Sequence, residues 1–179
     1  VPGARTYLEV GMRARTSPDA FRALSATLLA ELYLSKTRRD KLTDGAREAC
    51  LAAAAEWQQQ ALDWYTEGRD AIGMLNGRLH LVKIMAYRGQ YDDAFRWNRH
   101  VTEEARQIKA FEVLWQSLAL NGLIHSRRGD LPSAIAAYES AAGEIEKIRG
   151  GMHSESARRG FFSSKLEVYQ ELVSLHARQ

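Results

Sequence analysis

The sequence is poor in cysteine, in proline and in long apolar runs. It has one cysteine, Cys50, and three prolines among 179 residues. A single cysteine excludes an intramolecular disulfide and any metal site built from several cysteines. No apolar run approaches the roughly 20 residues of a membrane-spanning helix, and no segment alternates apolar and polar residues as a β-strand does. We therefore expect an all-α chain that carries no disulfide and crosses no membrane.

The two ends of the sequence carry few signals. Val1-Pro2-Gly3 is not followed by the apolar core of a signal peptide, so we expect a cytoplasmic protein. At the other end, Leu175-His176-Ala177 still has a helical pattern without a stop signal. We therefore expect the chain to be a segment of a longer polypeptide.

The positive charge of the chain is too dispersed to indicate a nucleic-acid surface. The net charge is +3, with 26% charged residues, and the arginines lie among Glu and Asp. Doublets such as Arg127-Arg128 suit solvated helix ends, where cations complement the helix dipole. A nucleic-acid footprint needs clustered cations, so we expect no direct contact with nucleic acid. Arginine outnumbers lysine and alanine is abundant, which is typical of proteins from GC-rich bacterial genomes.

Two glycine turns set the organisation of the chain. Arg88-Gly89-Gln90 and Arg128-Gly129-Asp130 each separate two amphipathic patterns. Glycine suits the left-handed residue that ends a helix, and Asp130 suits the N-cap of the next helix. Such short connections make neighbouring helices antiparallel hairpins. We expect a single repeat domain over residues 1–179 with about seven helices, in hairpins at about 17–66, 69–109 and 111–149 and a final helix at 154–179.

Apolar side chains recur at three- and four-residue steps along each expected helix. On the first helix they include Phe21, Leu24 and Leu28, which we expect to face the core. Ile72 and Phe111 begin the corresponding stripes of two later helices. Cys50 lies in an alanine-rich stretch and is predicted to be a small buried apolar residue.

The second glycine turn carries a family signature. Gly122, Gly129, Ala134, Tyr138 and Ala141 together resemble the tetratricopeptide repeat: a small residue, a glycine turn, alanine, an aromatic residue and alanine. The physical reason is packing, because two helices cross closely only where side chains are small. The resemblance implies a right-handed α-solenoid of antiparallel helical hairpins.

The earlier turn is a degenerate copy of the same signature. Gly89 and Ala94 are kept, but Val82, Asn98 and Val101 replace the glycine, the aromatic residue and the second alanine. The interval between the glycines at positions 89 and 129 also exceeds the period of roughly 34 residues that is usual for this repeat. The chain is therefore similar to tetratricopeptide proteins with lengthened helices.

A second resemblance covers residues 131–176. Glu144–Arg149, Ser154–Phe162 and Val168–Val173 look like the last repeats that precede the caspase-like CHAT protease domain of bacterial proteins. The protease residues are not in this chain, so the resemblance implies a regulatory or partner-sensing segment. Similar long repeats occur in the sensor arrays of bacterial transcription regulators. The alternative is therefore a sensor domain of such a regulator, in which a small ligand or self-association switches the state.

The sequence offers no recognisable catalytic or metal-binding pattern, and we expect neither an enzyme nor a cofactor. Gly73 and Gly77 match no phosphate-binding loop and are interpreted as contact points between helices. The histidines form no pair at helical ligand spacing and are interpreted as surface or packing residues. They are His80, His100, His125, His153 and His176.

A repeat array of this kind leaves an extended groove lined by the first helix of each pair. The inner-face positions of tetratricopeptide repeats, carried over at the interval between the two glycine turns, combine amide, cationic and aromatic groups. These groups suit an extended peptide of acidic character. We therefore predict a protein-interaction module that binds a partner protein or peptide. The predicted partner-binding residues are Asn76, Lys83, Tyr87, Gln116, Arg127, Arg159 and Ser163.

Overall fold

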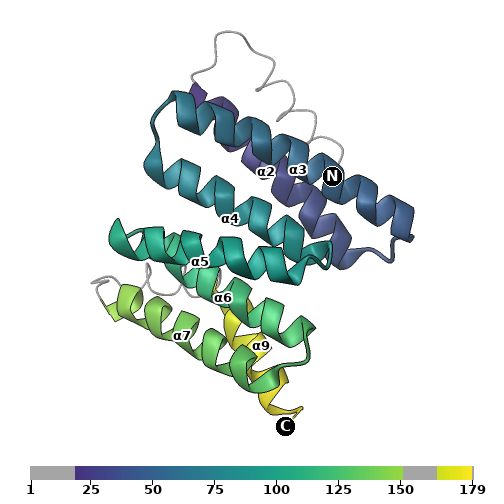
Figure 1. Ribbon diagram of the computed structural model, residues 1–179, viewed down its shortest axis with the longest axis vertical. Coiled ribbons are helices and arrows are strands. Elements are labelled where there is room, and N and C mark those ends of the chain that lie inside the picture. Colours follow the sequence, from purple (N-terminus) through teal and green to yellow (C-terminus); the bar gives the residue numbers. More distant parts are fainter. Residues whose placement is uncertain (1–18, 151–164, 179) are drawn as a thin grey trace. The chain divides into compact units, whose positions relative to one another are not determined.

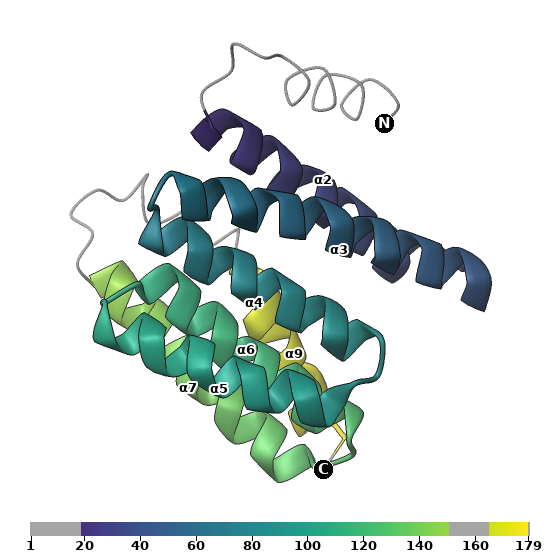
Figure 2. The same cartoon turned by 45° about the horizontal axis from the view of Figure 1, so that its top comes forward.

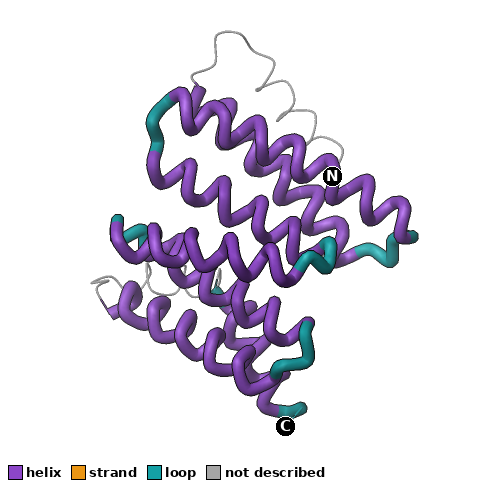
Figure 3. Tube along the Cα trace, viewed as in Figure 1, coloured by secondary structure: helices purple, strands orange, loops and turns teal. Residues whose placement is uncertain are grey.

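The computed structural model describes residues 19–150 and 165–178 of the chain. Within these ranges the chain is all-α, and no strand occurs (Figure 3). This confirms the predicted fold class. The helices are α2 (Asp19–Arg39), α3 (Asp44–Glu67), α4 (Ala71–Tyr87), α5 (Tyr91–Gln107), α6 (Phe111–Arg127), α7 (Leu131–Gly150) and α9 (Leu166–His176) (Figure 1).

The chain divides into two compact units, Val1–Gln90 and Tyr91–Gln179. The boundary falls in the turn between α4 and α5, so the predicted hairpin at 69–109 contributes one helix to each unit. The two units are described separately below, and the single repeat domain stays a prediction.

Four successive turns share one backbone geometry and recur at a constant interval along the chain. The residue in the left-handed region has φ of 53° at Arg69, 80° at Gly89, 58° at Lys109 and 81° at Gly129. Two of these positions are glycine, as predicted, and two carry a side chain. The structural period is therefore one helix and one turn, which is half the spacing that the glycines alone reveal.

The hydrogen bonds of these turns repeat as well. The backbone N–H one residue beyond each left-handed position donates to a carbonyl five residues earlier, as in Asp70 to Tyr65 at 2.9 Å and Asp130 to His125 at 3.0 Å. This is the Schellman motif, which satisfies carbonyls at the end of a helix. Asp130 then caps α7, because its Oδ1 accepts from the N–H of Ser133 at 3.2 Å.

In the first unit, α2 packs on α3 and α3 packs on α4 (Figure 2). The face of α2 that enters the core is built largely from small side chains. Gly73 of α4 lies against the ring of Tyr65 of α3, where an added Cβ would come within 2.3 Å of Cδ1. Gly73 is thus a contact point between helices, as predicted. Two apolar clusters in the described part of the unit have as their buried residues Ala26, Leu29, Ala30, Leu34, Leu51, Ala54, Ala61 and Ile84.

The predicted core stripe of α2 is wrong at three positions. Phe21, Leu24 and Leu28 are exposed, because α2 turns its alanines towards α3 and α4 and keeps these large side chains outside the core. Ile72 and Phe111, at the first turns of α4 and α6, are also exposed. Where a helix carries apolar residues on two sides, the neighbouring helices determine which side is buried.

In the second unit, α6 and α7 form the closest hairpin. Tyr138 of α7 is buried against Gly122 of α6, where a Cβ would lie 2.5 Å from the tyrosine Cδ2. This bears out the packing role predicted for the small residue. The final helix α9 joins the same core through Val168 and Leu175, which pack with Ile145 of α7.

Candidate functional site

The predicted site residues of the first unit lie on one side of α4. Asn76, Lys83 and Tyr87 follow one another at steps of seven and four residues, which place them on one face of a helix. All three are partly buried. The ring of Tyr87 packs at the edge of the apolar cluster of α2, α3 and α4. The amide, the ammonium group and the phenol are therefore displayed by one rigid element.

The predicted residues of the second unit repeat this spacing on α6. Gln116 and Arg127 are separated by the same number of helical positions as Asn76 and Tyr87 of α4. Gln116 is partly buried and donates from Nε2 to Oε1 of Glu112 at 3.5 Å, whereas Arg127 is exposed.

The last two predicted residues, Arg159 and Ser163, lie outside the described residues.

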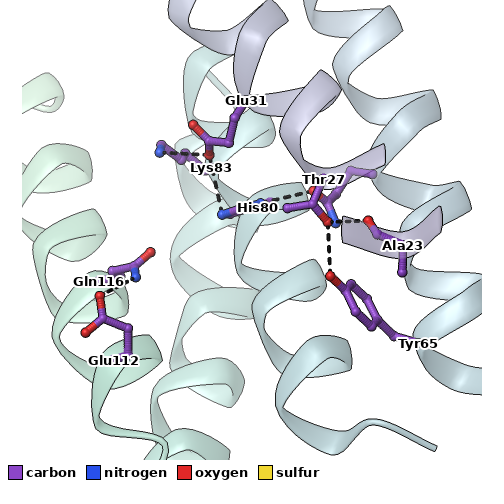
Figure 4. Close-up of polar contacts among 9 residues, drawn as sticks. Ala23, Thr27, Glu31, Tyr65, His80, Lys83, Glu112 and Gln116 are labelled. Carbon is purple, nitrogen blue, oxygen red and sulfur yellow. Dashed lines mark hydrogen bonds and ion pairs between the residues drawn. The ribbon is translucent and has the colours of Figure 1, made fainter. Parts of the chain in front are cut away.

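Lys83 belongs to a polar cluster that the sequence did not reveal. Its Nζ donates to Oε1 of Glu31 in α2 at 3.4 Å, and the same oxygen lies 3.4 Å from Nε2 of His80. His80 in turn contacts Oε1 of Gln58 in α3 through Nδ1 at 3.0 Å. Figure 4 shows Glu31 between Lys83 and His80. One carboxylate thus ties α2 to two side chains of α4.

Burial keeps His80 neutral near pH 7. Burial lowers the pKa of His80 to about 4, and this effect outweighs the attraction of Glu31. A neutral imidazole has one N–H donor and one acceptor nitrogen. If Nδ1 of His80 donates to Oε1 of Gln58, then the lone pair on Nε2 of His80 faces the carboxylate of Glu31. In that arrangement the buried Nε2 of Gln58 has no hydrogen-bond partner.

A half-turn of the Gln58 amide gives both nitrogens a hydrogen-bond partner and leaves the amide oxygen, instead of the amide nitrogen, without one. The amide nitrogen then donates to Nδ1 of His80, and the Nε2–H of His80 donates to Glu31. Amide oxygen and nitrogen exchange places in such a turn, and the hydrogen-bond network decides between them. In this arrangement the hydrogen bonds run in one direction, with Gln58 of α3 donating to His80 of α4 and His80 donating to Glu31 of α2.

Glu31 is ionised in this cluster. Burial raises its pKa, but the charge of Lys83 and the further contributions of His80 and Arg38 outweigh burial, so the pKa of Glu31 lies below its ordinary value. The Glu31 carboxylate remains more than one-third exposed, so a ligand reaching Lys83 meets Glu31 as well.

The sequence interpretation treated His80 as an isolated surface or packing residue. His80 is buried, and its packing role is consistent with that interpretation. What was missed is its carboxylate partner, because Glu31 lies on another helix. The one available signal is local: a histidine three residues before a lysine on a mostly apolar helix.

The second unit contains a buried polar contact of its own. Asn98 of α5 is fully buried and donates from Nδ2 to the carbonyl of Ser117 at 2.7 Å and to Oδ1 of Asn121 at 2.8 Å. Asn98 is at the position predicted to correspond to that of Tyr138. A hydrogen-bonded amide therefore stands at the first position and a packed aromatic ring at the second.

His125 has the packing role predicted for it. Its ring lies edge-on to Phe95, with centroids 5.2 Å apart, and its Nδ1 lies 3.3 Å from a carboxylate oxygen of Asp130. It thus links α5 to the turn before α7.

An open hollow of about 410 Å³ lies on α3, away from the predicted site residues. Its lining combines two carboxylates, two amides and an indole, which are groups that suit a small cation. The described residues that line it are Glu56, Trp57, Gln59, Gln60 and Asp63.

No group of three or more His, Cys, Asp or Glu side chains in the described ranges is placed to hold a metal ion. Across residues 19–150 and 165–178, none of the helices has the length and apolar content needed to cross a bilayer. Comparison of the chain with protein-family models and with curated proteins finds no match.

Proposed function

We propose that this chain is a non-catalytic protein-interaction module that binds a partner peptide in the groove of a tetratricopeptide-like array. The observation that supports this best is the shared face of Asn76, Lys83 and Tyr87 on α4. Gln116 and Arg127 have the matching register on α6. Rigid helices that display spaced amide, cationic and aromatic groups suit recognition of an extended chain.

The partner peptide has acidic character. Lys83 already has one carboxylate beside it, Glu31, at 3.4 Å, and the Lys83 side chain is about one-quarter exposed. A carboxylate of the partner joins or displaces Glu31 at Lys83. Arg127 provides a second cation for the same class of ligand.

In the wider proposal, the module is cytoplasmic and belongs to a larger bacterial protein. It regulates an attached CHAT protease by sensing a partner. The observation behind this is the sequence pattern of residues 131–176, which resembles the repeats next to such proteases. Sequencing the gene beyond Gln179 tests this part of the proposal, since a caspase-like domain must follow.

The binding proposal is tested with a display library of short random peptides. Peptides enriched on the wild-type chain are labelled with fluorescein, and their Kd is measured by anisotropy. In the double variant Lys83→Gln with Arg127→Gln, we expect the Kd to rise about tenfold or more. The control is Arg96→Gln with Lys147→Gln, which removes two exposed cations outside the predicted groove. Equal losses in both double variants would contradict the groove assignment.

The hollow on α3 favours a second candidate, a sensor domain for a small cationic ligand. Trp57 contributes an indole to its lining, and Glu56 and Asp63 contribute carboxylates. A thermal-shift screen of small organic amines tests it. A ligand that stabilises the wild type but not Trp57→Ala would favour the sensor over the peptide-binding module.

A further inference from the structure

The outer face of α2 carries three large apolar side chains that are about half exposed. Phe21, Leu24 and Leu28 are 50%, 51% and 46% exposed. They recur at steps of three and four residues, so they form one continuous stripe. We call these three residues the α2 stripe. Single exposed apolar side chains are common, but contiguous ones mark interaction sites.

The α2 stripe leads directly to the polar cluster around Lys83. Glu31 follows Leu28 by three residues, which places it on the same side of α2. Glu31 contacts Lys83 of α4, so the stripe and the predicted site residue form one continuous surface within the first unit. The surface has an apolar part and a charged end.

Cations dominate the charged end. Arg38 is exposed and follows Glu31 by seven residues, which places it on the same side of α2, and Lys83 adds a second cation. Arg38 and Lys83 both act on Glu31, which is the carboxylate shared by this end of the surface. Electrostatic complementarity therefore calls for an occupant that carries negative charge.

Charge also distinguishes three candidate occupants of this surface, which are residues 1–18 of the chain, a second copy of the chain and a separate partner. Residues 1–18 contain Arg5, Arg13 and Arg15 against the single acid Glu9, so this segment has the same sign as the charged end. A second copy packed symmetrically would bring the same cations together. A separate partner with acidic residues meets neither obstacle.

We propose that the α2 stripe and the adjoining Glu31–Lys83 pair form the docking surface for a partner segment in which apolar residues are flanked by Asp or Glu. The apolar side chains pack on Phe21, Leu24 and Leu28, and the acidic end lies towards Lys83. This rests on the proposed function, since it extends the predicted groove from α4 onto α2 and specifies the peptide that the groove takes.

The test uses the labelled peptides enriched from the random library and the full chain. The key variant is Leu24→Ser with Leu28→Ser, and the control is Val173→Ser, which changes an apolar side chain of α9 that is 71% exposed. All of these side chains lie outside the core, so folding is preserved and is checked by circular dichroism.

We expect the enriched peptides to combine apolar residues with Asp or Glu. The key variant should raise their Kd about tenfold or more, and the control should leave it unchanged. Peptides resynthesised with Asn and Gln in place of Asp and Glu should bind at least about tenfold more weakly. The acidic peptides should also lose affinity as salt increases.

Five results would overturn the proposal. Peptides that respond to Lys83→Gln but not to the key variant would leave the groove on α4 intact and remove the α2 stripe from it. Basic or uncharged peptides that bind equally well would refute the acidic partner. A dimer that the key variant dissolves in sedimentation experiments would make a second copy the occupant. Binding that appears only after deletion of residues 1–16 would make that segment the occupant. A selection that enriches no peptide would refute both this inference and the proposed function.

Discussion

Gly122 of α6 lies against the aromatic ring of Tyr138 of α7, so closely that a Cβ at position 122 would sit 2.5 Å from Cδ2 and 2.6 Å from Cε2. Carbon atoms of real side chains do not approach to such distances without displacement. The hairpin of α6 and α7 therefore depends on the absence of a side chain at one residue and the presence of a large one at the other.

The first prediction concerns this contact. Gly122→Ala should destabilise the chain by about 2 kcal/mol, because the buried ring of Tyr138 has to move or the helices have to separate. Urea unfolding followed by circular dichroism measures the effect. Gly143→Ala is the matched control on α7, since no atom lies within 4 Å of a Cβ added there. The control should stabilise the chain by about 0.5–1 kcal/mol, and a loss of the same size in both variants would contradict the packing argument.

The second prediction concerns the turns that lack glycine. Lys109 has φ of 58°, a left-handed conformation that costs a residue with a side chain about 1–2 kcal/mol. Lys109→Gly should therefore stabilise the chain by about 1 kcal/mol despite the greater entropy of glycine in the unfolded state. Gly129→Ala, at the equivalent position with φ of 81°, should destabilise it by a similar amount. Both values come from thermal unfolding, and a lower Tm for Lys109→Gly would show that the turn is held by its side chain.

The third prediction concerns the pH dependence of stability. The pKa of His80 is about 4 in the folded chain and about 6.5 in the unfolded chain. Protons therefore bind the unfolded chain more strongly. The contribution of neutral His80 to the free energy of unfolding is fully present above about pH 6.5 and is lost as the pH falls towards 4. Between pH 7 and pH 5 this loss amounts to about 2 kcal/mol.

His80→Asn should remove that part of the pH dependence. Urea unfolding at pH 7 and pH 5 on both chains gives the comparison, in which the other histidines cancel. The wild type should lose about 2 kcal/mol more than the variant over this interval. The pKa of Glu31 is lowered, so its own contribution is lost mainly below this interval. Equal losses in the two chains would contradict the neutral, buried state of His80.

Much of the fold followed from local features of the sequence. The glycines at 89 and 129 mark turns in which a left-handed residue is required, and both adopt it. Gly73 and Gly122 were predicted as contacts between helices, and both lie against an aromatic ring. Such features are readable because they depend on a residue's own backbone or on the next helix along the chain.

The turns at Arg69 and Lys109 fall at the predicted boundaries between hairpins, but neither has a glycine at the left-handed position, so the sequence did not reveal that they share the geometry of the glycine turns. Their geometry is imposed by the Schellman hydrogen bonds and by the packing of the flanking helices. The period of one helix and one turn is therefore visible only in the folded chain, whereas the glycines of the sequence show a period that is twice as long.

Part of the candidate site could be predicted from the sequence. The positions of Asn76, Lys83 and Tyr87 on one face of α4 follow from helical periodicity alone. The ion pair of Lys83 with Glu31 does not, because the two residues approach each other only once α2 and α4 are packed together.

The sequence by itself determined that this chain is helical, where its glycine turns fall and which small residues bring helices together, because these depend on short-range sterics and on hydrophobic periodicity. Only the tertiary structure decided which face of α2 is buried and which carboxylate meets His80 and Lys83. Phe21, Leu24 and Leu28 have the spacing of a core stripe, yet the alanines beside them fit more closely against the neighbouring helices. Which of two apolar faces is buried is settled by the shape of the partner helix, and that shape is assembled from residues far away in the sequence.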